Sequence, residues 1–202
     1  MKVRRLAFAL DYGLVGALAV MSGWTVPAWA QEHDAHLMTA QVQPRSAEQK
    51  KQGNALVAAV RDATERFRDV SAAEAEGYAL QFGCVSGGDY GAMGLHFVNF
   101  PLVVDGTIDA AAPEIVLYEP TANGRLRITG ADFVVLAADW DKTHTSAPEL
   151  NGQLFHFFEA PNRFGLPPFY TLHVWAWKDN PNGTFTNWNP SVSCDGFNPQ
   201  NH

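Results

Sequence analysis

From Tyr78 onward the sequence consists of short runs rich in aromatic and β-branched residues, separated by Gly, Pro, Asn and Asp. Runs of this length bounded by turn residues are typical of β-strands, and their close spacing favours antiparallel pairing. The predicted strands are Tyr78–Phe82, Gly94–Phe100, Glu114–Glu119, Arg125–Thr129, Asp132–Ala138, Leu154–Glu159, Tyr170–Lys178 and Thr184–Trp188. Most of the chain is therefore restricted to an antiparallel sheet.

One long amphipathic segment precedes these runs. The stretch Ser46–Gln49 matches a capping box, and apolar residues recur at helical spacing from Leu56 to Phe67. We expect a helix over Ala47–Arg68, and a second start signal predicts a short helix over Ser71–Gly77. The expected fold is α+β, with an N-terminal amphipathic helix packed on a bent antiparallel β-sheet or partial barrel.

The first residues have the pattern of an export signal. A basic start at residues 2–5 precedes an apolar stretch that ends in Ala28–Ala30, a small-x-small cleavage pattern. The glycines and the proline of that stretch favour a cleaved signal over a membrane anchor. We expect a signal peptide over residues 1–30, a flexible tail over 31–45 and a single α+β domain over 46–202, in a periplasmic or secreted protein.

The net charge of the exported chain restricts the classes of partner that we expect it to bind. Of 14 basic and 21 acidic residues, the signal holds three basic and one acidic, which leaves 11 and 20 and a net charge of −9. An acidic chain without a basic stripe is a poor ligand for nucleic acid or anionic lipid. After signal removal no apolar segment is long enough to span a membrane. A small-molecule ligand or substrate is the expected partner, and the oligomeric state is left open.

Both cysteines, Cys84 and Cys194, lie in the exported part of the chain. An even number of cysteines in an oxidising compartment favours a disulfide. The alternative is a pair of buried free thiols. A metal-binding role is disfavoured because no C-x-x-C spacing is present.

Three histidines lie in strand-like runs dense with apolar residues: His96 in "GLHFVNF", His156 in "LFHFFEA" and His173 in "YTLHVWAWK". A buried imidazole needs hydrogen-bond partners or a metal. Glu119 and Asp132 supply carboxylates within neighbouring runs.

Three imidazoles with one acid are a common ligand set for Zn²⁺, Cu²⁺ or non-haem iron. The sequence therefore suggests a divalent-metal site of the three histidines, with Asp132 or Glu119 as fourth ligand or general base. A structural hydrogen-bond network and a metal-free acid–base pair of His173 with Asp132 are the alternatives.

Aromatic residues flank the third histidine. Strand alternation puts Trp175 and Trp177 on the same face as His173, opposite Leu172 and Val174. Aromatic walls with a few polar groups are typical of small-molecule pockets. We therefore expect the two tryptophans to shape a ligand-binding wall.

The stretches "GAMGLHFVN" and "LHVWAWKDNPNGTFTNWNPSVSC" carry the patterns GxMGxHxVN and LHVWxWKxNPxGxFxxWNPxVSC. In these, and in "PEIVLYEP" and "FVVLAADW", the chain resembles a family of exported bacterial proteins to which no activity is assigned. The resemblance covers roughly residues 55–195. It implies recurrent histidines at 96, 156 and 173, a recurrent final cysteine, and an acidic residue, typically glutamate, at the position of Asp132.

Three functions fit this sequence. The first is an exported metalloprotein, whether enzyme or metal carrier. The second is a periplasmic small-molecule binding protein without catalysis. The third is an envelope structural or interaction domain whose histidines satisfy one another. Only two methionines follow the signal, which disfavours a Cu⁺ chaperone.

Overall fold

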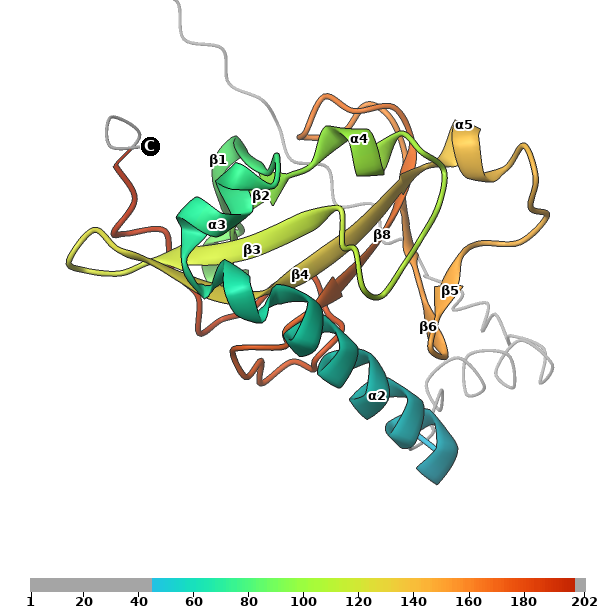
Figure 1. The fold of residues 1–202 in the computed structure, drawn as a ribbon, viewed down its shortest axis with the longest axis horizontal. Helices are drawn as coiled ribbons and strands as arrows, with labels where there is room; N and C mark the ends of the chain where they lie inside the picture. The colour runs from blue at the N-terminus through green and yellow to red at the C-terminus, as the bar shows by residue number, and fades with distance from the viewer. Residues whose placement is uncertain (1–44, 199–202) are drawn as a thin grey trace, which may run out of the picture. The chain divides into compact units, whose positions relative to one another are not determined.

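The computed structural model describes residues 45–198, and the predicted signal peptide and nearly all of the predicted tail lie outside them. The described part is α+β, as the sequence predicts: helices come first, and an antiparallel sheet follows (Figure 1). The helical elements are α2 (Ala47–Thr64), η1 (Glu65–Arg68), α3 (Val70–Ala75), η2 (Gly88–Tyr90), α4 (Phe100–Val103) and α5 (Ala137–Trp140).

The main sheet has six antiparallel strands in the order β1-β2-β3-β4-β8-β7, and it curls as a partial barrel (Figure 1). A separate two-stranded hairpin pairs β5 with β6. The strands are β1 (Ala79–Ser86), β2 (Ala92–Val98), β3 (Ile115–Pro120), β4 (Leu126–Leu136), β5 (Glu149–Leu150), β6 (Gln153–Leu154), β7 (His156–Phe158) and β8 (Phe169–Val174).

Four of the predicted strands differ from the structure in more than their bounds, among them Leu154–Glu159, which contains the end of β6 and all of β7. The predictions Arg125–Thr129 and Asp132–Ala138 are one strand, β4, which runs through Gly130. A Cβ at Gly130 would lie 2.1 Å from the Val174 carbonyl oxygen, so only glycine permits this close approach of β4 and β8. The prediction of a strand over Thr184–Trp188 is wrong, because these residues form turns.

The long helix begins where the capping box predicts. Ser46 Oγ accepts from the Gln49 amide at 3.1 Å, and Gln49 Oε1 accepts from the Ser46 amide at 2.9 Å. The prediction for the second helix is wrong in its start: Asp69 is the N-cap of α3, and its carboxylate accepts from the Ser71 amide. Asp69 is the stronger capping acceptor because its carboxylate is charged and lies next to the first helical residue.

Side-chain alternation gives the sheet two buried faces. The first, which we call the helix face, packs Phe133, Leu172 and Val174 against Leu56 and Val60 of α2. It continues under η1 and α3 as a second cluster, which contains Phe67, Ala73, Tyr78, Leu95, Phe97, Val116, Tyr118 and Ile128. Burial of these apolar side chains on both sides of the contact stabilises α2 on the sheet.

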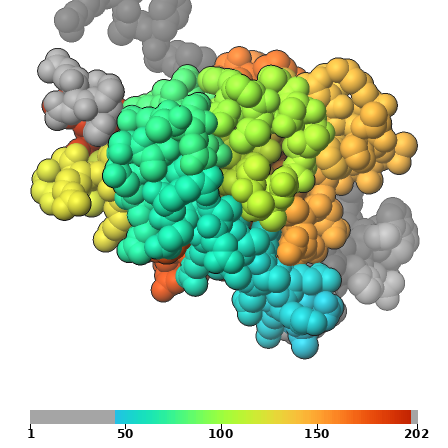
Figure 2. All heavy atoms as spheres, in the orientation of Figure 1, coloured from blue at the N-terminus to red at the C-terminus, as the bar shows by residue number. Residues whose placement is uncertain are grey.

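The opposite side, which we call the pocket face, carries a cluster of Val98, Val103, Ile115, Leu117, Val134 and Phe169. It is covered by α4 and by residues 159–168 rather than by the long helix; Val103 and Phe164 make these contacts. The space-filling view shows α2 in cyan beside the β5–β6 hairpin in orange (Figure 2). The two elements pack closely, since a Cβ at Gly152 would lie 2.3 Å from Gln52 Oε1.

Cys84 and Cys194 form the predicted disulfide, with Cα atoms 5.8 Å apart. The bridge ties β1 to the C-terminal segment across 110 residues of sequence. No helix within residues 45–198 combines the length and the apolar character that a membrane crossing requires.

Candidate metal centre

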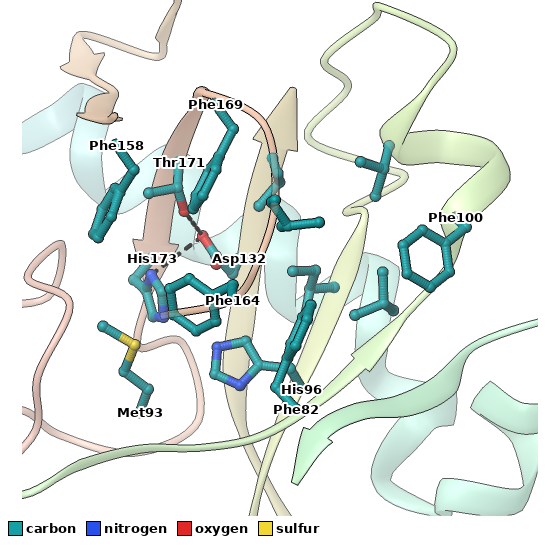
Figure 3. Close-up of a pocket in the computed structure, with 15 residues that line it drawn as sticks. Phe82, Met93, His96, Phe100, Asp132, Phe158, Phe164, Phe169, Thr171 and His173 are labelled. Carbon is teal, nitrogen blue, oxygen red and sulfur yellow. Dashed lines mark hydrogen bonds and ion pairs between the residues drawn. The ribbon is translucent and has the colours of Figure 1, made fainter. Parts of the chain in front are cut away.

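Three buried polar side chains converge on the pocket face: His96 from β2, Asp132 from β4 and His173 from β8 (Figure 3). One potential ligand atom from each lies within 4.8 Å of the others. Asp132 and His173 are direct cross-strand partners, so their side chains point to the same side of the sheet. His96 reaches them across β3 because the sheet curls.

Asp132 is fixed by a neighbour on β8. Thr171 donates its hydroxyl to Asp132 Oδ1 at 2.5 Å, and both residues are buried. His173 Nδ1 lies 3.2 Å from the same oxygen. The carboxylate is therefore oriented between a hydroxyl and an imidazole, and its other oxygen makes no hydrogen bond within the described residues.

His96 is held in one orientation by backbone. Its Nδ1 lies 3.3 Å from the Gly94 carbonyl oxygen, so the neutral ring donates there and leaves Nε2 as the acceptor. Burial is the main cause that lowers the pKa of His96 to about 4, and His173 lowers it further, against the opposing effect of Asp132. The ring is therefore neutral at neutral pH, which is the form that binds a metal.

His173 is 2% exposed, yet neither of its ring nitrogens makes a hydrogen bond within residues 45–198. The 3.2 Å approach to Asp132 lacks the alignment of a hydrogen bond. A buried polar atom without a partner costs about 1–3 kcal/mol, and most buried side-chain nitrogens avoid that cost. The ring can therefore offer a nitrogen to an ion held between the three side chains.

The cluster lies at one end of an apolar pocket. Eleven of the fifteen lining residues are apolar, and five of these are phenylalanines. The four polar lining residues are Thr171 and the members of the cluster. The void within and at the mouth of the pocket totals about 480 Å³, but only about 30 Å³ is open to the centres of water molecules. The pocket therefore leaves little room for water beside the cluster.

Two imidazoles and one carboxylate are a donor set that suits Zn²⁺ or Fe²⁺, and this number of protein ligands leaves coordination positions open. The three residues come from separate rigid strands, and hydrogen bonds orient His96 and Asp132. Such outer hydrogen bonds are typical of protein metal sites. The arrangement can hold an ion and present it to a molecule in the pocket.

The structure does not bring His156 into the cluster. This histidine lies on the edge strand β7, opposite Thr171, and it is exposed. Its place at the edge of the sheet explains the difference, because a residue in an apolar run is buried only where another element covers it. The buried cluster therefore has two of the three predicted imidazoles.

Glu119 is also outside the cluster, although it is only 4% exposed. Its two carboxylate oxygens accept from Arg127 Nε and from Lys178 Nζ, each at 2.6 Å. These two cations neutralise the buried charge of Glu119, so this residue belongs to a structural network of ion pairs. Asp132 is the carboxylate that the structure places beside the imidazoles.

Neither predicted tryptophan lines the pocket. Trp175 lies near His173, with ring centroids 6.2 Å apart, but its indole donates to the Thr186 carbonyl and packs on Ala92. Trp177 lies on the helix face, where its indole donates to Thr64. Regular alternation ends at Val174, so the predicted shared face does not extend to Trp177.

The pocket residues that sequence reasoning missed have weak local signals. Thr171 shares the face of His173 by strand periodicity, and that signal could have found it. Phe82 precedes a glycine within a strand, which indicates a bulge. Phe164 lies in a loop, and only its contacts reveal its role.

No protein-family model matches the sequence, and neither a curated protein nor a solved structure is significantly similar to it.

Proposed function

We propose that this protein is an exported metalloprotein that binds one divalent transition-metal ion through His96, Asp132 and His173. The ion presents an open coordination position to a small molecule in the phenylalanine-lined pocket. The observation that carries the proposal is the buried ring of His173: neither nitrogen makes a hydrogen bond within the described residues, and the ring lies within ligand distance of Asp132 and His96.

Two further features support a metal over a self-satisfied polar network. Asp132 already accepts from Thr171, so the cluster does not need His173 to satisfy that oxygen. The tautomer of His96 that donates to Gly94 leaves its Nε2 lone pair for an ion. Zn²⁺ and Fe²⁺ fit this donor set best.

Export is proposed on sequence and covalent structure together. The signal-like first 30 residues direct the chain out of the cytoplasm. The Cys84–Cys194 disulfide is consistent with an oxidising compartment. The resemblance to exported bacterial proteins agrees with both.

Elemental analysis of the exported chain, purified without an affinity tag or chelator, tests the metal. We expect about one ion per chain, since residues 45–198 contain one such cluster. His96→Ala, Asp132→Asn and His173→Ala should each lose it. The matched control is His156→Ala, which removes an exposed histidine outside the cluster and should retain the ion.

Failure to bind Zn²⁺, Cu²⁺ or Fe²⁺ on reconstitution would overturn the proposal. Loss of metal in His156→Ala as well as in His96→Ala and His173→Ala would return the site to the three-histidine set that the sequence suggests. The second candidate function is a metal-free small-molecule binding protein. It is favoured by the eleven apolar residues that line the pocket. It predicts ligand binding without any bound ion.

A further inference from the structure

The pocket chemistry restricts what can lie beside the metal centre. Among the described residues that line the pocket, Asp132 alone carries a formal charge, because no lysine or arginine is among them. When no ion is bound, an anion would lose its hydration there without gaining a cationic partner. The apolar end accepts a hydrocarbon body, and the cluster accepts a single polar group.

Phenylalanine dominates the walls, through Phe82, Phe100, Phe158, Phe164 and Phe169. Several of these rings already contact each other, such as Phe158 with Phe169 at 5.1 Å and Phe164 with Phe169 at 6.1 Å between centroids. Aromatic rings at such separations gain energy beyond area burial. A flat aromatic guest extends this arrangement better than a saturated one.

The pocket is closed to such a guest in the structure. The 30 Å³ open to water centres holds roughly two water molecules, since each needs about 10–15 Å³ by this measure. A six-carbon ring therefore requires a wall to move. The wall that moves must be exposed on one side and contact the centre on the other.

Phe82 meets both conditions. Its side chain is 39% exposed, and its ring lies 6.5 Å from His96 and 5.3 Å from Phe164 between centroids. Phe164 is itself 6.3 Å from His96 (Figure 3). The two phenylalanines, from β1 and from the loop of residues 159–168, thus meet over one ligand of the metal centre.

The backbone at Phe82 is built to place this ring. The β1–β2 register shifts between Gln81 and Cys84, which leaves Phe82 and Gly83 as a bulge. Both have φ of 63°, a left-handed conformation that a phenylalanine rarely adopts. Leu80 and Cys84 pack on the helix face, so regular alternation would put residue 82 there too. The bulge turns it to the pocket face.

We propose that the metal centre receives a small uncharged aromatic alcohol, and that Phe82 is the gate and specificity-determining residue, closing against Phe164. This inference rests on the proposed function, since the same centre binds the hydroxyl end. The strained conformation at Phe82 is of the kind that recurs at ligand clamps. The disulfide at Cys84 anchors the strand, so the ring moves while the backbone stays.

The test uses 4-fluorophenol with the metal-free and Zn²⁺-loaded protein, because ¹⁹F NMR reports both affinity and exchange rate without relying on the metal. In the metal-free protein, where the pocket contains no cation, we expect 4-fluorophenol to bind at least about 10-fold more tightly than anionic 4-fluorobenzoate or saturated 4,4-difluorocyclohexanol. Phe82→Gly accepts the positive φ and removes the ring, so exchange should accelerate at least about 10-fold. Phe164→Ala opens the other half of the gate and should act in the same direction.

Phe157→Ala is the matched control, because this ring is exposed, pairs with Tyr170 and does not line the pocket. Tighter binding of either comparator, or no 4-fluorophenol binding, would overturn the ligand class even if the ion binds. Unchanged exchange in both Phe82→Gly and Phe164→Ala would overturn the gate. Gated binding to a protein that takes up no ion on reconstitution would support the gate and contradict the proposed function.

Discussion

Asp132 is the residue through which the candidate centre is organised. It pairs with His173 across β4 and β8 and accepts the Thr171 hydroxyl on the same oxygen. A carboxylate oriented in this way is fixed before a metal arrives, which lowers the entropy that binding must overcome. Thr171 therefore acts as a positioning residue for a ligand rather than as a ligand.

Thr171→Val should weaken Zn²⁺ binding by about 10- to 100-fold, because an oriented ligand loses its hydrogen bond while the side-chain volume is kept. Competition against a chelator of known affinity measures the effect. Thr129→Val is the control: that buried hydroxyl makes no hydrogen bond within the described part of the chain, so its removal should leave metal affinity unchanged. Equal loss in both variants would contradict the positioning role of Thr171.

A second single residue, Glu114, makes the stability of the fold depend on pH. Burial is the largest cause that raises the pKa of this carboxyl to about 8, against hydrogen bonds to backbone that include the Val134 amide. A raised carboxyl pKa means that the fold favours the protonated form. Its contribution to stability is complete below about pH 4.5 and is lost as pH rises through 8.

Glu114→Gln should remove this dependence, so the wild type should lose at least ~1 kcal/mol relative to the variant between pH 5 and 8. Urea unfolding at several pH values measures the difference. His96, whose pKa is lowered to about 4, acts oppositely: its contribution is present above about pH 6.5 and lost as pH falls. The wild type and Glu114→Gln share this contribution of His96, so it cancels in the difference between their stabilities. A parallel pH profile for wild type and variant is the contrary result, and exposed Glu149→Gln is the control.

At the scale of elements, position in the sheet decided which predicted residues reached the centre. His96 and His173 lie on interior strands whose pocket face is covered by α4 and the loop of residues 159–168. His156 lies on the edge strand, and Trp177 follows the last residue of β8. Strand identity was predictable from periodicity, but edge position and the end of alternation depend on partners distant in sequence.

The start of α3 offers a direct test of local structure. Asp69→Ala should destabilise the protein by about 1 kcal/mol, because the side chain caps the helix through the Ser71 amide. Ser71→Ala, which the sequence would name as the cap, should cost less. Thermal unfolding of both variants measures the order, and a larger loss for Ser71→Ala would reverse the assignment.

At the scale of the whole molecule, the disulfide and the sheet carry the fixed frame, while the pocket depends on contributions from segments far apart. Cys84 lies two residues beyond the Phe82 bulge, so the bridge to Cys194 holds the strand from which the proposed gate projects. The bridge thus stabilises β1 beside the proposed gate.

The double variant Cys84→Ser with Cys194→Ser should lose roughly 4–5 kcal/mol of unfolding free energy, since the bridge closes a loop of about 110 residues. Urea titration against the oxidised wild type measures the loss. A decrease below ~1 kcal/mol would show that the unfolded chain is compact without the bridge.

The sequence by itself determined the strand-rich α+β class, the capped helix at Ser46 and the pairing of two cysteines, because periodicity, caps and parity depend on near neighbours or on simple counting. It also pointed to His96, Asp132 and His173. Only the tertiary structure decided that these three meet and that His156 and Glu119 do not join them. It also showed that Phe82 and Phe164, rather than the two predicted tryptophans, line the pocket. Register, bulges and curl set these outcomes, since they arise from contacts between strands that no local pattern encodes.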